Sequence, residues 1–450
     1  MTEGLVIPFT GEGSGSGRLS WGQQTIWRAF ETAGKPIWLT GLRAMPEGFT
    51  IEDLADELAF VMSRNQSLRT RLIVREGHPI TQVVYDSGQI KLQVLDLDDD
   101  ADPLAVAKAI EEDWLEHDVE YDLANDWPVR MILIRHRGVP AYRVRAFSHI
   151  VADGFGVLAM QADLAARDPG TGSPGGPITA MEPLEQAQWQ ASPAGRRRST
   201  IAEQHWERLL RTIPAQRVPE PTDKPEDRYW RVIFDSRAAY LAVQAIAART
   251  AVDTSPVLLA AYAVGVTKAT GIVPAVPRVY VNNRFRPRLA NTVSPIAQTC
   301  PCVIDVTGIT FDEAVKRTYY ASVAAYKNGY FEPVKIRELL AAISEERGEQ
   351  IDVNCVYNDI RLDTPRDVKN TPTGPAEIRA ALPLSTLRWE YKEIPEDVFN
   401  LLVQDSPDTI NMMMLVDSHY IARSQVETVL REIEAIVVRA AFDPDVPTGL

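Results

Sequence analysis

Stretches with strand-like and helix-like patterns alternate along nearly the whole chain of 450 residues, and this order limits the possible folds more than any other feature. Short β-branched and aromatic runs predict strands, while apolar residues every three or four positions predict helices. Interleaved strands and helices are typical of α/β folds. G-K-[ST], one phosphate-binding signature of nucleotide-binding sheets, does not occur in the sequence. The string GTGSPG at 170–175 matches G-x-G-x-x-G but lies in a Gly- and Pro-rich break rather than between a predicted strand and a predicted helix, where the signature requires it. We therefore expect an α/β protein without a nucleotide loop of these kinds.

The length predicts more than one hydrophobic core, roughly two to four lobes. The clearest break is the stretch RDPGTGSPGGPIT, residues 167–179, which carries four Gly and three Pro. A second Pro-rich stretch lies at residues 213–227. The predicted organisation is a flexible lead-in at 1–17, an N-terminal lobe at 18–180, a linker with a bridging helix at 181–228, and a C-terminal lobe at 229–450.

The formal net charge of −14 argues against nucleic acid or an anionic membrane as the main partner, because both need a positive surface. A local basic patch such as Arg196-Arg197-Arg198 remains compatible with that charge. No apolar run approaches the roughly 20 residues of a membrane span, and the N-terminus has no signal-peptide pattern. These features predict a cytoplasmic protein.

Cysteine usage predicts neither a disulfide framework nor a metal site. The chain has three cysteines, of which Cys300 and Cys302 form a C-x-C pair. No second pair or nearby histidine supplies the remaining ligands of a zinc site. We expect reduced thiols and no bound metal.

The most informative short stretch is FSHIVADGFG, residues 147–156, which lies between a predicted strand and a predicted helix. A histidine at a strand end is accessible and can act as a general base near neutral pH, which makes His149 a catalytic candidate. Asp153 lies four residues on and can brace the loop, and Gly154 allows a tight turn. A histidine that merely packs beside the strand is the alternative.

This stretch resembles the H-H-x-x-x-D-G motif of condensation domains of nonribosomal peptide synthetases, in the chloramphenicol acetyltransferase-like superfamily. Four further stretches resemble family motifs in the same order. They are LSWGQQTIW at 19–27, RNQSLRTRL at 64–72, DL and PVR within 122–130, and Asn283-Arg284 followed by VSPIAQT at 293–299.

The resemblance implies two chloramphenicol acetyltransferase-like lobes that form a V around a central tunnel. It gives His149 the place of the catalytic histidine, Asp153 that of the structural aspartate, and Arg284 that of its ion-pair partner. Ser148 stands where the family has its first histidine, which is a departure from the motif.

The resemblance further implies that Ser294 and Gln298 lie along the substrate tunnel and that Gly154 and Ser148 support the site. No cofactor is expected to be bound. The substrates are expected on the phosphopantetheine arm of acyl or peptidyl carrier proteins, which would be the partners. With no adenylation or carrier-domain sequence visible, the chain resembles a free-standing condensation enzyme.

The predicted function is acyl transfer from a carrier-bound acyl or aminoacyl thioester to an amine or hydroxyl, in nonribosomal peptide or related biosynthesis. Two alternatives stay open. One is a catalytically silent domain that binds carrier proteins and recruits another enzyme. The other is a small-molecule acyltransferase that uses acyl-coenzyme A.

Overall fold

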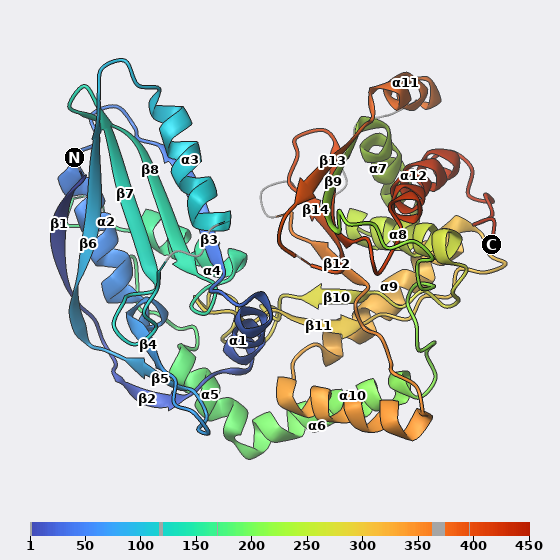
Figure 1. Ribbon diagram of the computed structural model, residues 1–450, viewed down its shortest axis with the longest axis horizontal. Helices are drawn as coiled ribbons and strands as arrows, with labels where there is room; N and C mark the ends of the chain where they lie inside the picture. Colours follow the sequence, from blue (N-terminus) through green and yellow to red (C-terminus); the bar gives the residue numbers. More distant parts are fainter. Residues whose placement is uncertain (1, 117–119, 169, 362–373, 396) are drawn as a thin grey trace. The chain divides into compact units, whose positions relative to one another are not determined.

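The computed structural model describes residues 2–116, 120–168, 170–361, 374–395 and 397–450. The chain divides into two compact units, each assembled from two stretches of sequence. Unit 1 comprises Met1–Arg197 and Asn282–Ala297, and unit 2 comprises Arg198–Val281 and Gln298–Leu450. Both units combine sheets with helices, so the predicted α/β class is confirmed (Figure 1).

Unit 1 contains a five-stranded sheet in the order β1-β6-β7-β8-β3 and a three-stranded sheet in the order β2-β5-β4. Its elements are β1 (Thr2–Thr10), β2 (Gly15–Arg18), α1 (Trp21–Ala33), β3 (Trp38–Ala44), α2 (Ile51–Arg64), β4 (Thr70–Ile73), β5 (Thr81–Val84), β6 (Ser87–Leu97), α3 (Pro103–Glu116), β7 (Val129–His136), β8 (Val139–Ser148), α4 (Gly154–Ala165) and α5 (Pro183–Ala191).

The five-stranded sheet is apolar on both faces because helices cover both. Along β8, Val144 and Ala146 face the side where α3 packs (Figure 1). Phe147 belongs to the opposite face and packs with the apolar side chains of α2, such as Leu58. The alternation along one strand thus separates two small cores.

Unit 2 contains a seven-stranded sheet in the order β11-β10-β12-β14-β15-β9-β13. Its elements are β9 (Tyr229–Ser236), α7 (Arg237–Thr250), α8 (Thr254–Thr270), β10 (Arg278–Val281), β11 (Gln298–Pro301), α9 (Phe311–Asn328), α10 (Pro333–Arg347), β12 (Val356–Asp359), α11 (Pro375–Ala381), β13 (Thr386–Lys392), β14 (Phe399–Gln404), β15 (Ile410–Asp417) and α12 (Arg423–Ala440). Helix α6 (Pro193–Leu210) crosses the boundary between the units in sequence.

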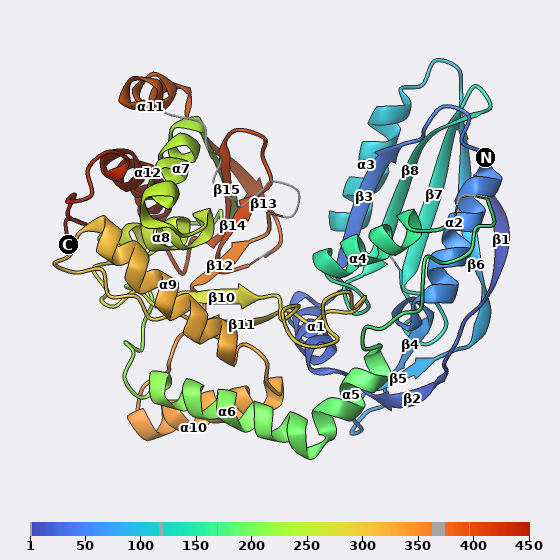
Figure 2. The ribbon, with the colours of Figure 1, turned by 180° about the vertical axis from the view of Figure 1, so that it is seen from behind.

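The large core of unit 2 lies where α7, α8 and α12 pack together beside the sheet (Figure 2). Ala260 and Gly265 of α8 are among the small residues that permit this packing. A side chain at Gly265 would place its Cβ 2.7 Å from the carbonyl oxygen of Val429. The glycine is therefore required by the close approach of α8 and α12.

The lead-in predicted at residues 1–17 is wrong over its described part, because β1 pairs with β6 and β2 pairs with β5. The glycines there serve close packing. The guanidinium of Arg69 is buried and donates to the carbonyl oxygens of Gly13 and Glu12 at 3.1 and 2.7 Å. A side chain at Gly11 would put its Cβ 2.1 Å from the carbonyl oxygen of Ser63.

The boundaries of the units also differ from the predicted ones. Residues 181–197, expected in the linker, belong to unit 1, and so does the stretch 282–297 from the second half. The apolar run at residues 302–306 reads as a strand in the sequence, but β11 ends before it, at Pro301. Ile304 makes only an isolated bridge with Ala275.

Among the described residues, no single helix is long and apolar enough to cross a membrane. Helices α7 and α8 pass that test only as a pair, with a bend of 113° between them.

Candidate functional site

The loop between β8 and α4 is held rigidly although its sequence is partly polar. The backbone N–H of His149 donates to the carbonyl oxygen of Ile37 at 2.8 Å, and that of Val151 donates to Ser148 at 3.0 Å. Ile150, Val151 and Ala152 are each only 1% exposed. These three buried residues directly follow the histidine, and together with the backbone hydrogen bond to Ile37 they fix its position just after β8.

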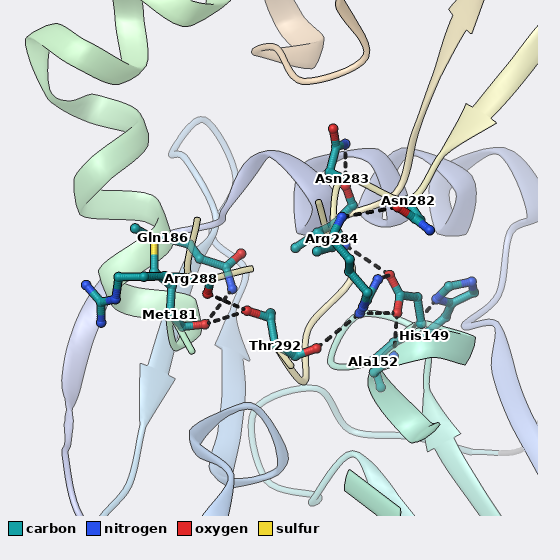
Figure 3. A network of polar contacts seen from close by, with 12 residues as sticks. His149, Ala152, Met181, Gln186, Asn282, Asn283, Arg284, Arg288 and Thr292 are labelled. Carbon is teal, nitrogen blue, oxygen red and sulfur yellow. Dashed lines mark hydrogen bonds and ion pairs between the residues drawn. The ribbon is translucent and has the colours of Figure 1, made fainter. Parts of the chain in front are cut away.

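The imidazole of His149 is half-buried, and its Nδ1 lies 2.9 Å from the carbonyl oxygen of Ala152 (Figure 3). A carbonyl oxygen can only accept, so Nδ1 must carry the proton of this hydrogen bond. In the neutral ring the lone pair is then on Nε2, which can accept a proton from another group. The loop thus sets both the tautomer and the orientation of the ring.

Asp153 connects the loop, the start of α4 and the stretch 282–297. Its carboxylate accepts from the backbone N–H of Gly156 at 2.8 Å and of Ile296 at 3.2 Å. Arg284 adds two hydrogen bonds, at 3.0 Å from Nη1 and 2.6 Å from Nη2 (Figure 3). Asp153 also caps α4, because its side chain satisfies an otherwise free amide of the first turn. The expected ion pair is therefore present in unit 1.

Arg284 is in turn fixed by its own segment. Its Nη2 also donates to the carbonyl oxygen of Thr292 at 3.0 Å, and its guanidinium lies 5.5 Å from the ring centroid of Phe155. The side chain of Asn283 donates to the carbonyl oxygen of Ile296 at 2.9 Å. Hydrogen bonds within the 282–297 segment thus hold the guanidinium of Arg284 and the backbone N–H of Ile296 in position to donate to Asp153.

Close packing at the site depends on Gly156 and Gly22, which the sequence did not single out, rather than on Gly154. Gly154 is exposed and begins α4, and it is not among the described glycines with a positive φ, so the helical backbone there does not itself require a glycine. A Cβ at Gly156 would lie 3.3 Å from Oδ1 of Asp153. A Cβ at Gly22 in α1 would lie 1.7 Å from the carbonyl oxygen of Pro295, so α1 packs directly on that backbone.

Ser148, at the position of the family's first histidine, is fully buried at the end of β8. Oγ of Ser148 makes no hydrogen bond within the part of the chain that the structure describes, and burial raises the pKa of the nearby Tyr121 hydroxyl. Ser148 therefore lies in a closed environment next to an aromatic hydroxyl.

Ser294 and Gln298, predicted along a substrate tunnel, are 0% and 1% exposed. The amide of Gln298 donates to the carbonyl oxygen of Phe331 at 2.9 Å and accepts from its N–H at 3.0 Å. In this structure Gln298 thus supports the backbone of a neighbouring loop, and its place beside a tunnel remains a prediction.

The cysteines are buried and free. Burial raises the pKa of Cys302 to about 12 and that of Cys355 to about 11. Neither thiol is a nucleophile at neutral pH. Within the described ranges, no group of three or more His, Cys, Asp or Glu residues is arranged to hold a metal ion.

The sequence matches the family described as Condensation domain over residues 23–447. Among curated proteins, it is 27% identical over 331 residues to an isonitrile lipopeptide synthase of Mycobacterium tuberculosis, covering 69% of this chain and 13% of that protein. It is 24% identical over 332 residues to the phosphinothricin tripeptide synthetase PhsC of Streptomyces viridochromogenes, covering 71% of this chain and 30% of that protein. The chain thus spans less than a third of either relative.

Solved structures share the fold at lower identity. The condensation domain that mediates chain release from the enacyloxin polyketide synthase superposes with a TM-score of 0.69 at 19% identity, covering 96% of this chain and 84% of the other. The X-domain from teicoplanin biosynthesis gives a TM-score of 0.67 at 18% identity, with 96% of each chain covered. The chain belongs to the condensation-domain family, the family of nonribosomal peptide biosynthesis.

Proposed function

We propose that this chain is an acyltransferase that condenses a thioester-bound acyl or aminoacyl group with an amine or hydroxyl. The observation that carries the proposal is the geometry of His149: Nδ1 lies 2.9 Å from the carbonyl oxygen of Ala152, so in the neutral ring the basic lone pair would be on Nε2. A general base in this position typically contributes about 10²–10⁴-fold to the rate.

In the proposed reaction, Nε2 of His149 accepts a proton as the nucleophile attacks the thioester carbonyl. A C–N or C–O bond forms, the C–S bond breaks, and the leaving thiolate takes up the proton. Backbone N–H groups at the start of α4, next to Gly154, would stabilise the oxyanion. Carrier-protein phosphopantetheine would present the acyl group, and the residues of this chain would hold the reactants in the proposed tunnel.

A second candidate is a silent recruitment domain, which the structural similarity to the teicoplanin X-domain favours. The loop that would be catalytic retains the histidine and its supporting aspartate, and this supports the first proposal over the second. Transfer from acyl-coenzyme A would use the same chemistry with a different donor.

The test compares wild type with His149→Ala and with His78→Ala, an exposed histidine of the same unit. Each protein is incubated with acyl-loaded carrier proteins and candidate amines and alcohols, and intact carrier masses are followed. We expect condensed product from wild type and His78→Ala, and at least a hundredfold less from His149→Ala with an unchanged melting temperature.

Equal rates for wild type and His149→Ala would overturn the proposed role of the histidine. Binding of the carriers without turnover by any variant would favour recruitment. Turnover of coenzyme A thioesters without a carrier would favour an acyltransferase that takes its acyl group from acyl-coenzyme A.

A further inference from the structure

We infer that Thr292 is a positioning residue for His149 and acts on it through Arg284 and Asp153. The hydroxyl of Thr292 anchors the turn at 288–292, and its carbonyl oxygen orients the guanidinium that holds the histidine loop. The inference rests on the role of His149 in the proposed function, but its first test requires no turnover.

The side chain of Thr292 is buried, with only 1% of the residue exposed, and its hydroxyl lies between two backbone carbonyls (Figure 3). Oγ1 is 3.2 Å from the carbonyl oxygen of Met181 and 3.4 Å from that of Arg288. These two residues are also joined directly, because the N–H of Met181 donates to the carbonyl oxygen of Arg288 at 2.8 Å. The side-chain amide of Gln186 donates to the carbonyl oxygen of Met181 at 2.9 Å. The hydroxyl thus links the turn to the stretch that leads into α5.

Packing alone does not hold this turn. A cavity of about 270 Å³ adjoins it, lined among others by Met181, Asn291 and Val293. Arg288 has a left-handed backbone (φ 62°), which a residue with a side chain adopts only where its surroundings fix it. Hydrogen bonds, among them that of the Thr292 hydroxyl, therefore determine the position of the turn.

The guanidinium of Arg284 approaches Asp153 end-on, through Nη1 and Nη2. Its Nε is buried and has no hydrogen bond among the described residues. A side-on approach through Nε and Nη2 would satisfy that nitrogen, and a buried donor without a partner costs free energy. The carbonyl oxygen of Thr292 accepts from Nη2 at 3.0 Å and thereby favours the end-on orientation.

The position of Asp153 affects the imidazole through one peptide group. The carbonyl oxygen that lies 2.9 Å from Nδ1 of His149 belongs to the peptide bond between Ala152 and Asp153. A change in how Asp153 is held therefore turns this carbonyl. Which ring nitrogen carries the proton depends on the hydrogen bond that the other can make, so without the carbonyl in place the neutral ring would populate both tautomers.

The first experiment determines the tautomer of His149 by long-range ¹H–¹⁵N correlation NMR in alkaline buffer, where imidazole is neutral. His149→Ala identifies its signals among those of the six histidines. For wild type we expect the proton on Nδ1. Thr292→Val keeps nearly the same shape but lacks the hydroxyl, and we expect a mixture of tautomers. Thr292→Ser keeps the hydroxyl and should resemble wild type.

Thr70→Val is the matched control. Thr70 is also 1% exposed and belongs to unit 1, and its hydroxyl donates to the carbonyl oxygen of Gln66 at 2.8 Å, away from Thr292 and Arg284. This variant should lose a comparable amount of melting temperature and keep the wild-type tautomer.

The second experiment measures kinetics with acyl-loaded carrier proteins. Thr292→Val should lower kcat by about 10–10²-fold at an unchanged KM, because a misplaced catalytic group slows the chemical step without weakening substrate binding. Thr292→Ser and Thr70→Val should keep the kcat of wild type.

The same tautomer in Thr292→Val as in wild type would overturn the inference, with or without turnover. So would an equal change in Thr70→Val, because the change would then follow from lost stability in general. If Thr292→Val does not fold, Thr292→Ala is measured in its place against the same control. A tautomer difference without turnover by any of the proteins would leave the positioning role standing and overturn the proposed function.

Discussion

Arg284 donates two hydrogen bonds to the carboxylate of Asp153, 131 residues earlier in the chain, and the two side chains are only 9% and 8% exposed. An arginine in this environment is stabilised mainly by its carboxylate partner. The pair therefore fixes the position of the loop that carries His149.

Asp153→Asn should lower the free energy of unfolding by about 3–5 kcal/mol, because it leaves the charge of Arg284 buried and uncompensated. Asp153→Asn combined with Arg284→Met should lose less than the single Asp153 variant, since no unpaired charge remains. Urea unfolding of the variants measures this. An Asp153→Asn protein as stable as wild type would refute the bracing role.

Gly22→Ala tests the contact between α1 and the 282–297 segment. Gly22 lies in the first turn of α1, where helix propensity alone would favour alanine by at most about 1 kcal/mol. Here the new Cβ would collide with the carbonyl oxygen of Pro295, so we expect destabilisation by about 1–3 kcal/mol. Thermal unfolding decides the sign, and an increase in melting temperature would show that the segment lies further from α1.

Glu182 at the start of α5 makes the stability depend on pH. Desolvation raises its pKa from 4.5 to about 7, although Arg69 and a backbone hydrogen bond from Gln66 oppose the shift. The folded protein then keeps this proton up to about pH 7, while the unfolded chain releases it near pH 4.5. The unfolded chain binds fewer protons across that window, so the free energy of unfolding falls as pH rises through it.

Glu182→Gln should remove this part of the pH dependence and be more stable than wild type by about 1–3 kcal/mol at pH 8, with little difference near pH 4.5. Denaturant unfolding at several pH values measures the effect, with the exposed Glu47→Gln as the control. Parallel pH profiles of wild type and Glu182→Gln would contradict the prediction.

Gln298→Ala should destabilise unit 2, because the buried N–H and C=O of Phe331 would lose their partners. Each unsatisfied group costs about 1–3 kcal/mol. If Gln298 also lines a substrate path, KM or kcat should change beyond what the loss of folded protein explains. Unfolding curves and kinetics on the same preparation separate the two roles.

Ser148→His would restore the family's first histidine. Ser148 is fully buried, so the larger ring should destabilise the protein by about 1–3 kcal/mol through overpacking. We expect no gain in acyl transfer. A faster and equally stable Ser148→His enzyme would show that the second histidine is accommodated and useful.

Most helices could be predicted from the sequence because their apolar periodicity and caps are local signals. Thr50, for example, is a typical N-cap residue with an acidic residue three positions on, and it caps α2 through reciprocal hydrogen bonds with Asp53. Strand β1 was missed because the Gly- and Ser-rich stretch GEGSGSG at residues 11–17 predicted a flexible lead-in, and the strand itself contains Pro8. At the edge of the sheet, where β1 lies, the missing N–H does not break an interior ladder.

Within the candidate site, the resemblance indicated His149, Asp153 and Arg284, whose side chains carry recognisable chemistry. Ile296 could not be identified in this way, because it contributes a backbone N–H to Asp153 and its side chain gives no sign of it. Gly22 was missed for a related reason: its importance comes from the backbone of Pro295, 273 positions later in the sequence.

The composition of the two units has a consequence for dissecting the protein. Unit 1 needs the stretch 282–297, which is flanked on both sides by sequence of unit 2. A cut of the gene at codon 198 would give an N-terminal fragment in which Asp153 has lost Arg284 and the amide of Ile296. We therefore expect that fragment to fold poorly by itself and to be complemented by a peptide spanning 282–297.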